Sequence, residues 1–101
     1  MTDDFAFEPK TVTVDTGTTV TWTNPGDVPH TVTAYEDEIP DGAAYFASGG
    51  FESERAARNN LKEGLIVPDE TYGHTFEQSG TYGYFCIPHE SSGMVGTVRV
   101  K

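Results

Sequence analysis

The sequence predicts an all-β fold, a Greek-key β-sandwich or barrel of about seven to eight short strands with one short helix. Three observations support this. Thr, Val and aromatic residues are frequent, which favours strands. Apolar and polar residues alternate in short runs, and turn-forming residues separate these runs at regular spacing. The 101 residues suit one core, so we expect residues 1–101 to form a single domain.

The alternating runs give the order of the expected strands. Strands are expected over residues 5–8, 11–14, 19–23, 30–35, 65–67, 72–77, 82–86 and 95–100. Residues 36–50 lose this periodicity and are expected to form a surface loop. Residues 53–63 contain good helix formers and precede Gly64 in a stop position, which predicts the helix.

The charge balance limits the kinds of partner. Sixteen acidic residues stand against six basic ones, for a net charge of −10. Such a surface repels nucleic acid, because affinity for phosphates comes from Lys and Arg. Two interpretations remain: adaptation to high salt, or an acidic patch, such as residues 36–38, that steers a basic partner. No apolar run is long enough to span a membrane, and no signal peptide is expected within the chain.

A thiol, an imidazole and a thioether lie close together near the C-terminus. Cys86, His89 and Met94 fall within nine residues, just after an expected strand. His30, beyond a turn at residues 24–29, is a candidate fourth ligand. Two His and one Cys with a weak axial Met form a blue-copper site, whereas zinc has little use for a thioether. The sequence therefore predicts one copper ion at these four residues.

Three segments carry a family resemblance. Residues 28–32, 80–89 and 93–98 resemble the plastocyanin branch of the cupredoxins, and within it the acidic halocyanins. The resemblance implies the same four copper ligands and assigns His89 as the surface port for electrons. Four positions depart from many plastocyanins: Phe85 replaces Tyr, Ser91 and Ser92 replace Gly and Ala, and Thr31 replaces Asn. These departures leave the ligands intact but argue against a docking mode copied from plants.

The resemblance implies a one-electron carrier that cycles Cu(II) and Cu(I) between membrane redox partners. It also implies a monomer outside the cytoplasm, on the outer face of the cytoplasmic membrane, tethered through a removed N-terminal segment. The alternative is a copper-holding module or the excised domain of a larger redox protein. Few methionines, only Met1 and Met94, favour the carrier over a copper-delivery protein. The single cysteine excludes a binuclear copper site, and catalysis is not expected.

Several other residues invite a structural interpretation. We expect His74, Trp22, Tyr82 and Tyr84 to pack in or against the core. Pro88 has no backbone N–H to donate to the Cys86 sulfur. The Thr31 N–H is therefore the expected donor to that sulfur.

Overall fold

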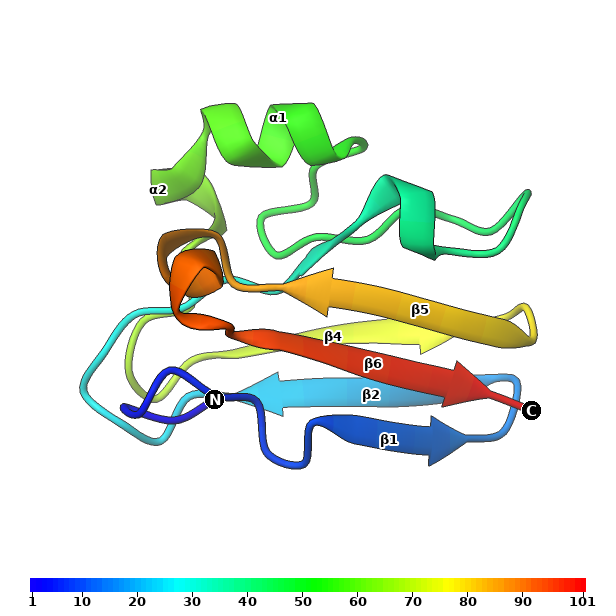
Figure 1. The fold of residues 1–101 in the computed structure, drawn as a ribbon, viewed down its shortest axis with the longest axis horizontal. Coiled ribbons are helices and arrows are strands. Elements are labelled where there is room, and N and C mark those ends of the chain that lie inside the picture. Colours follow the sequence, from blue (N-terminus) through cyan, green and yellow to red (C-terminus); the bar gives the residue numbers. More distant parts are fainter.

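Two β-sheets pack face to face in the computed structural model, which describes residues 1–101 (Figure 1). Six strands form them. Their bounds are β1 Thr11–Val14, β2 Thr18–Thr23, β3 Thr33–Ala34, β4 Thr71–Phe76, β5 Gly80–Phe85 and β6 Val95–Val100. One sheet has the order β1-β6-β5-β3, and the other pairs β2 with β4. The expected all-β sandwich is confirmed.

Strand pairing explains which side chains enter the core. β5 runs antiparallel to β6, with Tyr82 opposite Val98 and Tyr84 opposite Gly96. β1 runs parallel to β6, and β2 runs antiparallel to β4 with Trp22 opposite Tyr72. Because side chains alternate between the faces of a strand, one face of each strand points between the sheets.

Aromatic rings fill the space between the sheets. The ring of Trp22 packs edge-on against Tyr84 at 5.3 Å and stacks on Phe46 at 6.0 Å. His74 stacks on Phe46 at 4.8 Å and is partly buried, as expected. Tyr82 and Tyr84 are buried, so their expected core role is also confirmed.

The strand count is lower than expected. Residues 5–8 form no strand, because Thr2 and Ala6 close a small loop through backbone and hydroxyl hydrogen bonds. Residues 30–35 contribute only the two-residue β3 and two isolated bridges, from His30 to Ile66 and from Thr33 to Ala47. The expected strand at 65–67 forms only the bridge from Ile66 to His30. Single bridges form here because the segments cross briefly rather than running side by side.

The helical content is also divided differently. The expected helix over 53–63 is two helices, α1 Glu54–Asn59 and α2 Leu61–Gly64. Asn60 separates them because its backbone, at φ −134° and ψ 49°, leaves the helical region. Two short 3₁₀ helices, η1 Glu36–Glu38 and η2 Ile87–Ser92, complete the set.

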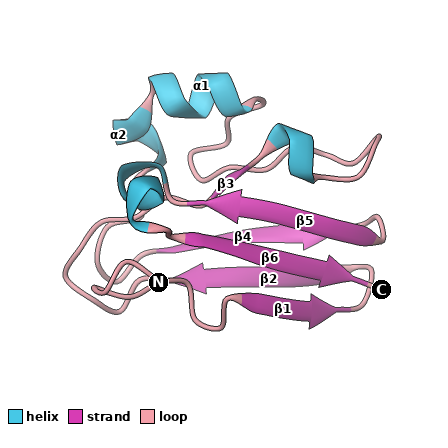
Figure 2. Cartoon of the chain, in the orientation of Figure 1, coloured by secondary structure: helices cyan, strands magenta, loops and turns pink.

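One end of the sandwich gathers the connecting segments that matter for function. Figure 1 shows the N-terminal segment, the loop before residue 30 and η2 at the same left-hand end, with α1 and α2 above β5. Figure 2 shows η2 as a compact helical turn where β5 stops and β6 starts. None of the helices has the length and apolar character needed to cross a membrane.

Candidate metal centre

Two separate loops bring three metal-binding groups together. Cys86 directly follows β5, His89 lies in η2, and His30 follows the loop after β2. The ligand atoms of these three residues all lie within 4.8 Å of one another. Met94 ends the same connection just before β6 and is fully buried. The segment 86–94 is called the ligand loop below.

Both imidazoles turn their Nδ1 atoms toward the thiol. The Cys86 sulfur lies 3.4 Å from His89 Nδ1 and 3.8 Å from His30 Nδ1. Metal–nitrogen and metal–sulfur bonds of about 2.0 and 2.3 Å at tetrahedral to trigonal angles place such atoms about 3.5–3.8 Å apart. The observed spacing therefore fits one ion shared by all three residues.

Burial separates the ligand candidates. His30, Cys86 and Met94 are each 0% exposed, whereas His89 is partly exposed. Burial raises the pKa of the Cys86 thiol, an effect that the Thr31 N–H partly offsets. Burial also lowers the pKa of His30 and His89, which favours the neutral imidazole that binds metals. A metal ion would bind the thiol as thiolate and release its proton.

The ligand loop closes on itself through its backbone. The Cys86 N–H donates to the Met94 carbonyl at 3.0 Å, and the Met94 N–H donates to the His89 carbonyl at 3.3 Å. Gly93 adopts φ 84°, a left-handed conformation that glycine accepts without a Cβ clash. Its N–H donates to the Glu90 carbonyl at 2.9 Å. These hydrogen bonds hold the backbone of the ligand loop in one conformation.

Thr31 contacts the thiol and the ligand loop together. Its N–H donates to the Cys86 sulfur at 3.3 Å, which confirms the expected donor. Its hydroxyl accepts a hydrogen bond from the Ile87 N–H at 2.8 Å, a contact that sequence patterns do not reveal. Thr31 therefore links the segment of His30 to the segment of Cys86.

Asn24 fixes the loop that carries His30. It is 1% exposed, and its side-chain amide donates to the carbonyls of Val28 and Ile66, both at 2.8 Å. Ile66 in turn exchanges two backbone hydrogen bonds with His30. The sequence Asn-Pro-Gly-Asp at residues 24–27 predicts a turn but does not indicate a buried amide.

Phe5 covers one face of His89. The two rings stack with centroids 4.3 Å apart and planes 15° apart, while Phe5 remains 38% exposed. Phe5 has φ 61°, a region that large side chains rarely adopt. Its expected place in a strand was wrong, and its contact with the candidate site depends on the path of the N-terminal segment.

The fold and the donor set define a cupredoxin, a β-sandwich with a copper site at one end. The family model for copper binding proteins of the plastocyanin/azurin family matches residues 1–101. The chain is 41% identical over 95 residues to a plastocyanin from Scenedesmus fuscus, covering 94% of this chain and 86% of the relative. The chain therefore belongs to the plastocyanin/azurin family.

Two further comparisons agree with this assignment. A chloroplastic plastocyanin from Tetradesmus obliquus is 40% identical over 95 residues, covering 94% of this chain but only 58% of the relative. The structure of oxidised plastocyanin from Dryopteris crassirhizoma matches with a TM-score of 0.66 and 26% identity, covering 95% of this chain and 88% of that one. Copper is thus the cofactor, and the class is one of electron carriers rather than enzymes.

Proposed function

We propose that the protein is a blue-copper one-electron carrier whose single copper ion is held by His30, Cys86, His89 and Met94. The observation that carries this is the buried Cys86 sulfur, which faces the Nδ1 atoms of both histidines. When bound, copper supplies a one-electron couple between its Cu(II) and Cu(I) states. The residues of this chain would hold the copper ion, keep water away from it and give electrons a path to the surface.

Rigidity and burial suit the ligand set to electron transfer. The hydrogen bonds within the ligand loop and the contact from Thr31 leave the side chains little freedom to move. Three of the four ligands are fully buried, so water is kept from them. His89 alone is partly exposed, which supports its role as the port through which electrons enter and leave.

The proposal extends to partners and location. We infer redox partners in a membrane electron-transport chain, a monomeric single domain, and a place on the outer face of the cytoplasmic membrane. Tethering through a removed N-terminal segment and a halocyanin-type, salt-adapted identity belong to the same proposal. The net charge of −10 and the resemblance of the copper-binding segments to halocyanins support it.

Copper titration of the metal-free protein tests the ligand assignment. We expect one equivalent of Cu(II) to produce an intense visible band from thiolate-to-copper charge transfer. Cys86→Ser should abolish the band, and His30→Gln should weaken or shift it. His74→Gln is the matched control, because His74 packs on Phe46 away from the thiol and should leave the band unchanged. A band that survives Cys86→Ser would refute the assignment.

Copper retention separates a carrier from a copper-holding module. A carrier should keep its ion in both oxidation states when a competing chelator is added, because its ligands are buried. A delivery or storage module should release copper readily in one of the two states. Rapid release from the reduced protein would therefore favour the alternative.

A further inference from the structure

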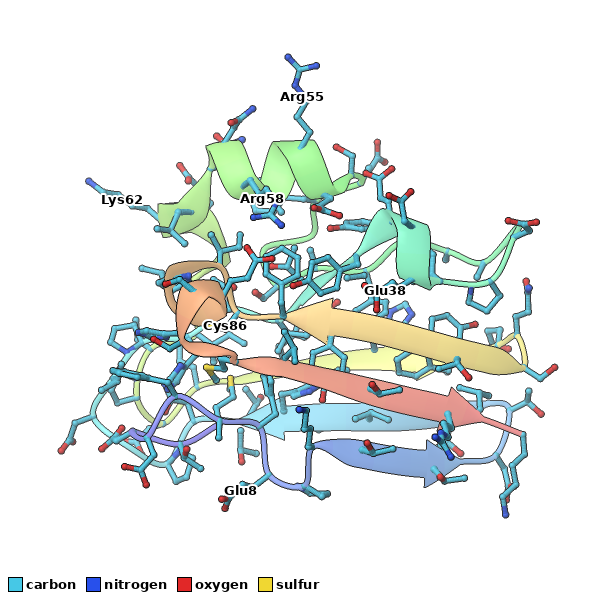
Figure 3. All side chains as sticks on the ribbon, viewed as in Figure 1. Glu8, Glu38, Arg55, Arg58, Lys62 and Cys86 are labelled. Atoms are coloured by element: carbon cyan, nitrogen blue, oxygen red, sulfur yellow. The ribbon has the colours of Figure 1, made fainter.

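A bidentate ion pair joins helix α1 to the ligand loop. Arg58, in the last turn of α1, directs its two terminal nitrogens at the Glu90 carboxylate, at 2.8 and 3.2 Å. Glu90 directly follows His89 in η2. Figure 3 shows the Arg58 side chain lying between α1 and the end of β5, whereas Arg55 extends from the opposite side of the helix into solvent. The loop is thus held from outside as well as by its own hydrogen bonds.

The Glu90 carboxylate has a third donor. The Tyr35 hydroxyl donates to it at 2.6 Å, so three hydrogen bonds from two separate segments converge on one side chain. Charge-assisted, two-pronged contacts of this kind fix orientation better than a single point charge does. A carboxylate restrained in this way restrains the backbone of the neighbouring His89.

Arg58 and Tyr35 also contact Phe85, the residue that precedes Cys86. The Arg58 guanidinium sits 4.3 Å from the centre of the Phe85 ring, and the Tyr35 ring stacks on Phe85 at 4.3 Å. Phe85 is 0% exposed and directly precedes Cys86. The cluster therefore contacts the neighbour of Cys86 on one side and the neighbour of His89 on the other.

Arg58 projects from a helix that is itself anchored. The Ser53 hydroxyl caps α1 by accepting from the Ala56 N–H at 3.1 Å. The Glu54 N–H donates to the Glu36 carboxylate at 2.6 Å, and the Glu36 N–H donates to the Glu54 carboxylate at 3.0 Å. Glu54 also accepts from Arg58 Nε at 2.9 Å. The contact with Glu54 thus orients the Arg58 guanidinium toward the ligand loop.

We propose that Arg58 is a positioning residue for the copper site, acting through Glu90 on His89 and through Phe85 on Cys86. It has two effects that can be separated. It holds the ligand loop in one geometry, and it neutralises the negative charge of the Glu90 carboxylate, which would otherwise have only the Tyr35 hydroxyl as a donor. The inference rests on the proposed ligation of copper by Cys86 and His89.

Arg58→Gln tests both effects against a matched control. Arg55→Gln removes the same charge from the same helix, but the Arg55 side chain extends away from the loop. Relative to Arg55→Gln, Arg58→Gln should release copper to a chelator about fivefold faster, the size expected for a lost bidentate pair at a partly exposed site. It should also lower the reduction potential further, because an unpaired carboxylate favours Cu(II) over Cu(I).

Two more variants separate charge from geometry. Arg58→Lys keeps the charge but not the planar fork, so it should restore most of the potential and only part of the copper retention. The pair Arg58→Gln and Glu90→Gln together should restore the potential but not the retention. Equal potentials and equal release rates for Arg58→Gln and Arg55→Gln would overturn the proposal.

Amide hydrogen exchange of the metal-free protein tests whether Arg58 holds the ligand loop in the absence of copper. The His89 and Gly93 amides donate to carbonyls within the loop. They should exchange about fivefold faster in Arg58→Gln than in the wild type, and at the wild-type rate in Arg55→Gln. Unchanged exchange in both variants would contradict the positioning role. If the wild-type protein fails to form a blue copper complex, the proposed function fails, and this measurement still decides whether Arg58 holds the loop.

Discussion

Replacing Thr31 by Val should destabilise the metal-free protein but leave the backbone N–H that donates to the Cys86 sulfur in place. Thr31 is 1% exposed, and Val has nearly the same shape without the hydroxyl. The change removes the acceptor of the Ile87 N–H at 2.8 Å and of the Thr33 hydroxyl at 3.3 Å. The Thr31 N–H, a backbone group, still reaches the Cys86 sulfur.

The cost follows from the polar groups left without partners. A buried donor without an acceptor costs about 1–3 kcal/mol, and the Ile87 N–H is only partly buried, so we expect a loss of about 1–2 kcal/mol. In a domain of this size each 1 kcal/mol lowers the melting temperature by about 4–8 °C. Denaturant unfolding of the metal-free protein at constant m-value measures the free energy of unfolding directly.

Two control variants sharpen this test. Thr31→Ser keeps the hydroxyl and should retain most of the stability. Thr13→Val changes an exposed residue of β1 and should shift stability by less than about 0.5 kcal/mol. The visible spectrum of copper-loaded Thr31→Val should stay close to that of the wild type. A stability loss no larger than that of Thr13→Val would refute the importance of the hydroxyl contact.

Three other predictions concern packing, the sulfur and salt. Gly96→Ala should lower the free energy of unfolding by about 2–3 kcal/mol, because a Cβ there would meet the buried Tyr84 ring at 2.5 Å. Gly83→Ala would meet only the Glu38 side chain, which can move, and should lower it less in the same unfolding assay. Pro88→Ala should raise the reduction potential measured by voltammetry, because a new N–H near the Cys86 sulfur favours Cu(I); a lower potential with an unchanged spectrum would contradict this. The melting temperature should rise between low salt and molar NaCl, because the Debye length falls from about 10 Å at 0.1 M to about 3 Å at 1 M, and a constant or falling value would count against salt adaptation.

The candidate ligands can be proposed from local sequence spacing because three of the four lie on one short loop. Cys86, His89 and Met94 fall within nine residues, so a single turn can gather them. The Thr31 donor could also be anticipated, because Pro88 lacks an N–H. Strand β6 was predicted with its observed bounds, since its alternation is regular and its partners β5 and β1 lie on both sides.

The missed features depend on tertiary placement. The Phe5 stack on His89 and the Arg58 pair with Glu90 join residues that are 84 and 32 positions apart, and no local pattern reports such contacts. The segment at 30–35 alternates like a strand but pairs only briefly, because strand length requires a neighbour as well as a pattern. The helix at 53–63 divides at Asn60, whose amide donates to the Ala56 carbonyl and ends the first helix.

A potentiometric titration of the copper-loaded protein, followed at its visible band, tests the central claim most directly. We predict a single reversible transition that fits one electron per copper and bleaches the band completely on reduction. The colour should return fully on reoxidation, because the buried ligands keep their positions in both states. A colourless Cu(II) complex, or irreversible loss of the band in the first cycle, would contradict the assignment of a one-electron blue-copper carrier.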